Sequence, residues 1–319
     1  MQHTTMPVPV MFAASADYTP TALARSVPYL FEGIGFLPSR SERILLKPNL
    51  LRAGGQEYIC SNAKLVAAVC RYVRDCGCDV RIGDSPGFGT AAGVARSIGL
   101  PQALAAVSCA DVPIITLDAP VSRPLTFGGS VGISRHALEA DRIVNIPKLK
   151  THSQMRITCA VKNLFGCVSG VRKAVLHTLH GDTERGGAAV FPAVVADIAS
   201  QLPPVVTLLD AVTAMHITGP SNGKPFHAGL LAASLSPVAL DTALYALLDL
   251  SPEAVPLWNE LQRRRMHGAF PDDIVLVGEP ATSFDVSSFV MPERLIPQTF
   301  NPFRLALSAV RRLWARVAG

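Results

Sequence analysis

Short apolar runs alternate along this chain with longer segments of helical period, and this alternation is the strongest constraint on its fold. The runs are too short for helices and are apolar at successive positions, which is typical of strands covered on both faces. Such strands alternating with helices predict an α/β fold, with a mostly parallel sheet and helices on both faces. The expected strands are residues 7–13, 43–48, 79–83, 112–117, 142–146, 205–210, 228–234 and 274–278.

The segments between these strands have the spacing of helices. The helix expected at 62–76 has Ser61 and Asn62 at its start, and either side chain can cap the free N–H groups of the first turn. No long linker is evident, so we predict one domain over residues 1–300, with two lobes dividing near 140–185 as the alternative. The expected helices are residues 21–33, 62–76, 90–98, 134–140, 154–165, 172–180, 188–201, 237–248 and 252–265.

The composition excludes several classes of protein. Of the 319 residues, 49% are apolar and 17% are charged, and the mean hydropathy is +0.31, whereas a disordered chain would be polar and highly charged. A membrane span needs about 18 apolar residues with few charges, but the most apolar stretches, 187–212 and 229–250, are interrupted by proline and aspartate. No basic segment precedes the apolar residues 8–16, so we expect no secretory signal and predict a cytoplasmic protein.

The seven cysteines are scattered, and no two of them form a Cys-x-x-Cys pair. The chain therefore has no motif for an iron–sulfur cluster. Most of the cysteines lie in apolar segments, where reduced thiols behave as small hydrophobic side chains. For Cys76 and Cys78, metal binding or redox chemistry is the alternative.

Polar side chains stand at the carboxyl ends of four expected strands. In open α/β sheets the ligand crevice lies outside these ends, so we expect the side chains to share one crevice. A carboxylate such as Asp210 can act as a base or hold a metal, or it can cap the following loop, and these alternatives stay open. The strand-end residues are Lys47 and Asn49, Asp84 and Ser85, Lys148 and Lys150, and Asp210.

Residues 142–181 contain seven Lys or Arg residues and no Asp or Glu, so this segment carries +7 while the remainder of the +5 chain carries −2. Such a segment suits an anion, namely a phosphate, a carboxylate or a nucleotide, and a solvated basic face is the alternative. Nucleic acid is disfavoured because Phe165 is the segment's sole Phe, Tyr or Trp. In an extended run, Lys148, Lys150 and His152 point to one face.

Two further patterns suggest specific partners. His177 and His180 lie three apart on an expected helix and share a face, so with His152 or Asp182 they can hold a divalent metal. The alternatives are contacts with the helix C-terminus, substrate contact or acid–base chemistry. Asp241 lies in an apolar helical segment, and because a buried carboxylate needs a partner, we expect a cation from the basic segment.

Taken in order, these residues resemble the domain of unknown function 362 family over about residues 43–248. Many members carry ferredoxin-like iron–sulfur modules, so the resemblance implies a redox partner on a separate protein. The chain departs from the family's pattern at Tyr58–Asn62, where a Thr-His-Pro-like stretch is common, and at His216, Thr218 and Ser236. The motifs are Lys47-Pro48-Asn49, Gly83–Gly87, Pro147–His152, Val161–Gly166 with Gly170, Arg172–Ala174, His177, Asp210-Ala211, Gly219-Pro220, Asn222-Gly223 and Pro237–Asp241.

Residues 301–319 form a separate pattern. Five apolar residues fall on one helical stripe, with arginines largely off it. This predicts a basic amphipathic helix that lies on an anionic membrane surface, docks on a partner or packs on its own domain. The stripe is Phe303, Leu307, Val310, Trp314 and Val317, and the arginines are Arg304, Arg311 and Arg312.

Together these patterns predict an α/β enzyme that acts on a small anionic molecule, with a divalent metal or redox chemistry as further options. The alternative is a non-catalytic cofactor-binding protein or an accessory to an iron–sulfur redox partner. Substrate, reaction and oligomeric state stay open. Protons would be moved by His152 or His177, and Asp84 or Asp210 would act as base or position a metal. The anion would be held by Lys47, Asn49, Lys148, Lys150, Lys162, Asn163 and Gly166.

Overall fold

The computed structural model describes residues 6–54, 57–87, 89–169, 184–185 and 188–295. Ten strands of this part form one sheet. They are β1 (Val8–Ala14), β2 (Arg43–Pro48), β3 (Asp79–Asp84), β4 (Ile114–Thr116), β7 (Arg142–Ile146), β8 (Lys148–His152), β9 (Arg156–Thr158), β12 (Val205–His216), β13 (Lys224–Ser234) and β14 (Ile274–Gly278).

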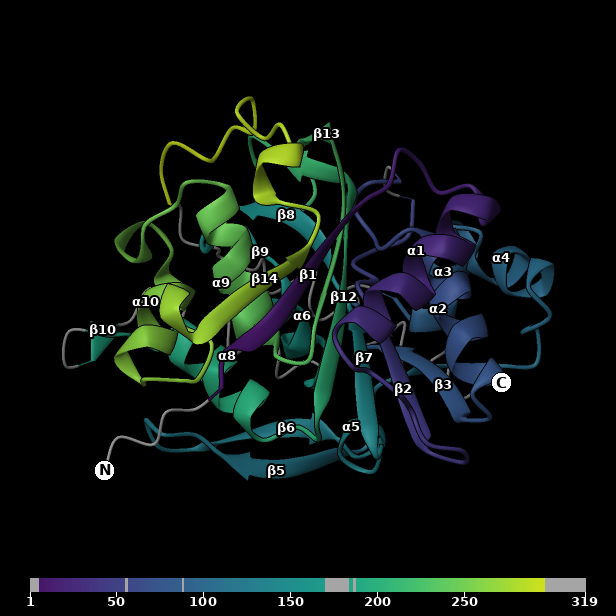
Figure 1. Ribbon diagram of the computed structural model, residues 1–319. Coiled ribbons are helices and arrows are strands. Elements are labelled where there is room, and N and C mark those ends of the chain that lie inside the picture. The colour runs from purple at the N-terminus through teal and green to yellow at the C-terminus, as the bar shows by residue number, and fades with distance from the viewer. Residues whose placement is uncertain (1–5, 55–56, 88, 170–183, 186–187, 296–319) are drawn as a thin grey trace.

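The main path of the sheet runs β14-β1-β13-β12-β7-β2-β3-β4, and β8 joins it at β12 with β9 beyond (Figure 1). Strands β12, β7, β2, β3 and β4 run parallel to one another, and β14 runs parallel to β1. Strand β13 lies between β1 and β12 and is antiparallel to both. The mostly parallel sheet predicted from the sequence is therefore confirmed. Small hairpins stand outside it, formed by β5 (Pro120–Pro124) with β6 (Ser130–Ser134) and by β10 (Glu184–Arg185) with β11 (Ala188–Ala189).

Helices cover both faces of the sheet, as predicted (Figure 1). The alternation along β2 shows this: Ile44 and Leu46 pack into one core cluster, and Leu45 packs into the cluster on the opposite face. The first face carries α1 (Pro20–Gly33), α2 (Ala63–Asp75), α3 (Ala91–Ser97) and α4 (Leu100–Ala106). The other carries α6 (Ala160–Asn163), α8 (Val190–Ser200), α9 (Pro237–Leu247) and α10 (Pro256–Arg263), and α5 (Arg135–Leu138) follows β6.

Two segments that were expected to be continuous helices are helical over only part of their length. The segment 154–165 contains β9, the four-residue α6 and a 3-10 turn, because Ile157 pairs with Thr151 in the β8–β9 hairpin. The segment 252–265 begins with a 3-10 turn, and α10 starts at Pro256. Val255 precedes this proline and adopts an extended backbone, as the proline ring demands of the residue before it. Further 3-10 turns span Pro271–Asp273 and Ala281–Ser283.

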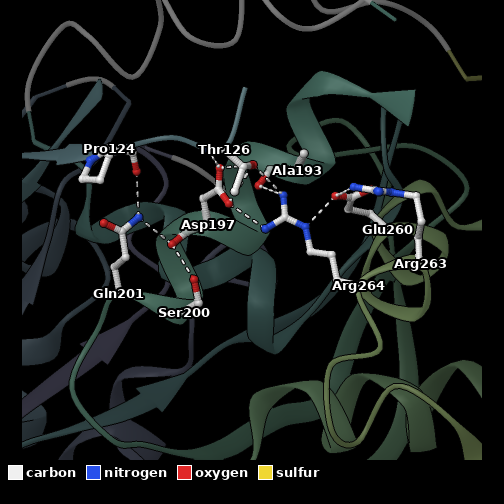
Figure 2. Close-up of polar contacts among 9 residues, drawn as sticks. All are labelled: Pro124, Thr126, Ala193, Asp197, Ser200, Gln201, Glu260, Arg263 and Arg264. Carbon is white, nitrogen blue, oxygen red and sulfur yellow. Dashed lines mark hydrogen bonds and ion pairs between the residues drawn. The ribbon is translucent and has the colours of Figure 1, made fainter. Parts of the chain in front are cut away.

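A network of charges ties α8 and α10 to the β5–β6 hairpin (Figure 2). The Arg264 guanidinium lies 2.6 Å from Asp197 on α8 and 2.6 Å from Glu260 on α10. Asp197 also accepts hydrogen bonds from the backbone N–H and the hydroxyl of Thr126. The network fixes the helical layer on this face without involving the strand-end residues.

The structure also bears on the expected cysteines and membrane spans. All seven cysteines are free, and six of them are buried, as predicted. No described helix is both long and apolar enough to cross a bilayer. The expected helices at 172–180 and 301–319 lie outside the described residues, and the domain division stays a prediction.

Candidate functional site

Three buried lysines lie near the carboxyl ends of β2 and β3, beside the middle of β12. Lys47 on β2 is 0% exposed, and Lys148 and Lys150 on β8 are each 2% exposed. Asp84 is the last residue of β3, as expected. The strand end expected at Asp210 is wrong, because β12 continues to His216 by pairing with β13, so Asp210 lies in mid-strand, opposite Lys148 at the start of β8. We call Lys47, Lys148 and Lys150 the lysine site.

Lys47 is neutralised by Asp84. Its Nζ lies 2.7 Å from the Asp84 carboxylate and donates to the Pro48 carbonyl at 2.7 Å. The same carboxylate accepts hydrogen bonds from the backbone N–H groups of Leu50 and Ser85, each at 2.7 Å. Asp84 is thus held by a cation and two amides, so its position serves to anchor Lys47 and the loop after β2.

Gly166 lies against this ion pair. A Cβ at position 166 would overlap the Lys47 Nζ and the Asp84 Oδ1. The absence of a side chain at Gly166 thus makes room for the ion pair, and its expected part in holding an anion stays a prediction.

Replacing Gly166 by alanine is therefore expected to lower the free energy of unfolding by about 1–3 kcal/mol, the usual cost of overpacking a core. Urea unfolding followed by circular dichroism measures this. Gly87→Ala is the matched control, because a Cβ there meets no atom within 4 Å. Equal stability of the two variants would contradict the steric role of Gly166.

Lys148 is paired with Asp210 and with Tyr18, a residue that the sequence analysis missed. The Lys148 Nζ lies 3.0 Å from Asp210 and 2.9 Å from the Tyr18 hydroxyl. Tyr18 donates to Asp210 at 2.6 Å, and the backbone N–H of Asn62 donates to the second carboxylate oxygen at 2.8 Å. Burial lowers the pKa of Lys148, while Asp210 opposes that shift. Burial and the Asp210 charge raise the pKa of Tyr18, which keeps its proton.

Lys150 differs from the other two lysines. Its Nζ donates to the Asn49 side-chain oxygen at 2.7 Å and to the Ile59 carbonyl at 2.8 Å. In the part of the chain that the structure describes, both of these partners are uncharged. Burial lowers the pKa of Lys150 to about 8, and the charges of Lys148 and Lys47 act in the same direction.

Asn163 links this lysine to β2. Its side-chain oxygen accepts from Asn49 at 3.1 Å, and its amide nitrogen donates to Asn145 at 2.8 Å and to the Lys47 carbonyl at 3.2 Å. Asn49 therefore points its NH₂ group at Asn163 and its oxygen at Lys150. The structure thus joins the predicted residues Lys47, Asn49, Lys150 and Asn163 in one network.

His152 and Lys162 lie beside this network. His152 is 4% exposed, and its Nδ1 accepts from the backbone N–H groups of Gln154 and Met155. Burial, with the charges of Lys162 and Lys150, lowers the His152 pKa well below 6.5, so the ring is neutral at pH 7 and can transfer a proton only through Nε2. Lys162 is half-buried over the Phe165 ring, 4.7 Å from its centroid.

Metal binding stays a prediction. The described residues contain no group of three or more His, Cys, Asp or Glu side chains that could hold a metal ion. His177 and His180, on which the metal prediction rested, lie outside them.

The expected cation partner of Asp241 is wrong. Its carboxylate accepts hydrogen bonds from the backbone N–H groups of Ala160 at 2.7 Å and Val161 at 3.0 Å. These groups belong to the predicted basic segment, but the segment contributes main-chain donors, because an unpaired N–H at the start of α6 also needs a partner. Burial raises the Asp241 pKa to about 6.

Three of the positions expected to depart from the family's pattern, Ser61, Asn62 and Ser236, have structural roles. Asn62 caps α2 by accepting from the Lys64 N–H at 2.9 Å, and Ser236 caps α9 by accepting from the Ala239 N–H at 3.2 Å. Ser61 instead donates to the Ile146 carbonyl at 2.6 Å and accepts from the Asn49 N–H. Of the two caps considered for α2, Asn62 is therefore the one used.

The profile of a family described as "Domain of unknown function (DUF362)" matches residues 44–246. The chain belongs to the DUF362 family. The matched region contains the whole lysine site together with Asp84, Asp210 and Asn163. A curated relative, the thylakoid-associated protein sll1697 of Synechocystis, is 34% identical over 316 residues, which is 96% of this chain and 95% of the relative.

Two solved structures show weaker similarity to this DUF362 chain. The lactate racemase apoprotein from Thermoanaerobacterium thermosaccharolyticum is 12% identical with a TM-score of 0.47, covering 77% of this chain and 58% of its own. A structural-genomics target from Thermotoga maritima is 12% identical with a TM-score of 0.43, covering 70% and 57%. The chain thus spans less than two thirds of either, and similarity at this level carries no information on activity.

Proposed function

We propose that this protein is an α/β enzyme that binds a small phosphate- or carboxylate-bearing molecule at the lysine site. The observation that carries the proposal is Lys150, a buried amine whose two described partners are neutral oxygens. Asp84 and Asp210 neutralise the other two lysines. Among these three lysines and two aspartates of the described chain, one positive charge is in excess, and a buried uncompensated charge costs several kcal/mol.

An anion at Lys150 would remove this excess. An ammonium group has three N–H donors, and Asn49 and Ile59 use two of them. Within the described residues these are its two hydrogen-bond partners, and we assign the third N–H to the ligand. The neighbouring ammonium groups of Lys47 and Lys148 add a positive potential that favours an anion.

The lowered pKa of Lys150 favours catalysis over passive binding. A side chain that titrates near the working pH can both donate and accept a proton, which is the requirement of general acid–base catalysis. With a pKa of about 8, Lys150 meets this requirement, whereas an ordinary lysine, at about 10.4, does not. We assign it the roles of anion ligand and proton carrier.

The pH dependence of binding follows from the same group. Because the pKa of Lys150 is depressed, its charge is present below about pH 8 and is lost as the pH rises through that value. Affinity for an anion of constant charge is therefore expected to fall above about pH 8. A bound anion favours the charged form, so it also raises this pKa.

Lys150→Met is expected to weaken anion binding at pH 7 at least about tenfold, because a hydrogen bond to a charged group contributes about 1.5–3 kcal/mol. Isothermal titration calorimetry with inorganic phosphate, pyrophosphate and small dicarboxylates measures the affinity. Lys64→Met, an exposed lysine on α2, is the matched control and should bind as the wild type does. Equal affinity of Lys150→Met and wild type would overturn the proposal.

Lys150→Arg separates an enzyme from a carrier. Arginine keeps the charge but does not titrate near pH 8. We expect this variant to bind the anion and to lose turnover of whichever anionic metabolite the wild-type protein converts. If wild type and Lys150→Arg bind equally and neither converts any anion screened, the non-catalytic alternative holds instead.

We also propose peripheral contact with a membrane through residues 301–319. The curated relative is named as thylakoid-associated, and the sequence of this segment combines an apolar stripe with arginines. Flotation with anionic vesicles tests this. The full chain should float with the vesicles and a chain lacking residues 301–319 should not. Equal flotation of both chains would contradict the proposed membrane contact.

A further inference from the structure

We infer that Asp241 is a positioning residue for the lysine site: it holds α6 in place, and α6 orients Lys150 through Asn163 and Asn49. The inference rests on the proposed function for its biological meaning. The structural basis of the inference is a series of hydrogen bonds that runs from Asp241 on α9 to Lys150. The effect of this series on Lys150 can be tested without any ligand.

Asp241 lies on α9, is 0% exposed and has four partners. Besides the N–H groups of Ala160 and Val161, the Tyr245 hydroxyl lies 3.4 Å away and the Cys159 thiol also hydrogen-bonds the carboxylate. The titratable groups that face it are thus Cys159, beside α6, and Tyr245, on its own helix. No lysine, arginine or histidine of the described chain forms an ion pair with it.

Helix α6 depends on this carboxylate. The helix has four residues, and Cys159 at its N-cap makes no capping hydrogen bond through its side chain. An isolated helix of one turn is not stable, and its first N–H groups need acceptors. Asp241 supplies the acceptor from 81 residues away in sequence.

The last residue of α6 transmits its position to the lysine site. Asn163 accepts from the Asn49 amide nitrogen, which leaves the Asn49 oxygen facing Lys150. If α6 moved, the Asn49 side chain would lose the partner that sets its orientation. Its NH₂ group could then turn toward Lys150, which would replace an acceptor by a donor.

The charge of Asp241 makes this link sensitive to pH. An ionised carboxylate can accept both N–H bonds, whereas a protonated one loses an acceptor position. Because the pKa of Asp241 is raised to about 6, the organised form of the site is present above about pH 6 and is lost as the pH falls through it. Above about pH 8, Lys150 loses its charge and anion affinity falls. Anion affinity should therefore be highest between about pH 6 and 8.

The test measures the pKa of Lys150 by competitive amine labelling with mass spectrometry, in the full chain without ligand. Asp241→Asn should lower this pKa, because Lys150 loses an acceptor that stabilises its charged form. Asn163→Leu leaves Asp241 bound to α6 but removes the hydrogen bond between Asn163 and Asn49, so it should also lower the pKa of Lys150. Asp241→Glu should restore at least part of the wild-type value.

Asp197→Asn is the control, because Asp197 is also a buried carboxylate that accepts backbone and side-chain hydrogen bonds, but on α8 (Figure 2). It should lower stability and leave the Lys150 pKa unchanged. If Asp241→Asn behaves in the same way, the carboxylate is only structural and the inference is overturned. If phosphate fails to bind the wild type while the Lys150 pKa shifts as expected, the proposed function fails and the positioning role stands.

Discussion

Asp84→Ala is expected to lower the free energy of unfolding by about 3–5 kcal/mol, because it leaves a buried ammonium without a counter-charge. The Lys47 side chain is 0% exposed and has the Asp84 carboxylate 2.7 Å away. The N–H groups of Leu50 and Ser85 lose an acceptor in the same variant. Urea unfolding followed by circular dichroism gives the value.

The double variant Lys47→Met with Asp84→Leu is the control for this effect. Removing both charges leaves no unpaired ion, and buried pairs replaced by apolar residues are often neutral in stability. We expect the double variant to recover most of the loss. An Asp84→Ala protein as stable as the wild type would show that Lys47 is not charged in the fold.

Asp210→Ala is also expected to lower the free energy of unfolding by about 3–5 kcal/mol, because it removes one partner from a buried ion pair. Here the carboxylate serves Lys148, the Tyr18 hydroxyl and the Asn62 N–H at the start of α2. The variant thus loosens three elements at once. Thermal unfolding by calorimetry should show the loss as a lower Tm and a lower unfolding enthalpy.

Tyr18→Phe separates the charge from the hydrogen bond. It removes the donor to Asp210 and the acceptor of Lys148 and of the Thr213 N–H, but leaves the ion pair. It should therefore cost about 1–3 kcal/mol, the range for leaving buried hydrogen-bonding groups unsatisfied. If Tyr18→Phe is as destabilising as Asp210→Ala, the phenol and not the carboxylate organises this part of the site.

The sheet was predictable because its strands are apolar on both faces. The bounds expected for β2, β7 and β14 agree with those observed, since each is a short run with a polar residue or a proline on either side. The strand-end residues could be grouped for a related reason: parallel strands place their carboxyl ends at one edge. This rule accounts for Lys47 and Asp84, whereas Asp210 lies in the middle of β12, beyond which the strand continues to His216.

The partners within the site could not be predicted in this way. Tyr18 lies in the loop before α1, 192 residues from Asp210, and no pattern connects them. Which lysine has a carboxylate and which has only neutral oxygens depends on sub-ångström packing. Asp241 shows the same limit, since its need for a partner was evident but a main-chain partner leaves no mark in the sequence.

The segment Tyr58–Asn62 touches the site through its main chain as much as through its side chains. Lys150 is held by the Ile59 carbonyl, and Asp210 by the Asn62 N–H. A backbone atom survives any substitution that preserves the path of the chain. Side chains in this segment can therefore change while the lysine and the aspartate keep their partners, so a substitution at Ile59 or Cys60 is a poor guide to whether the site persists.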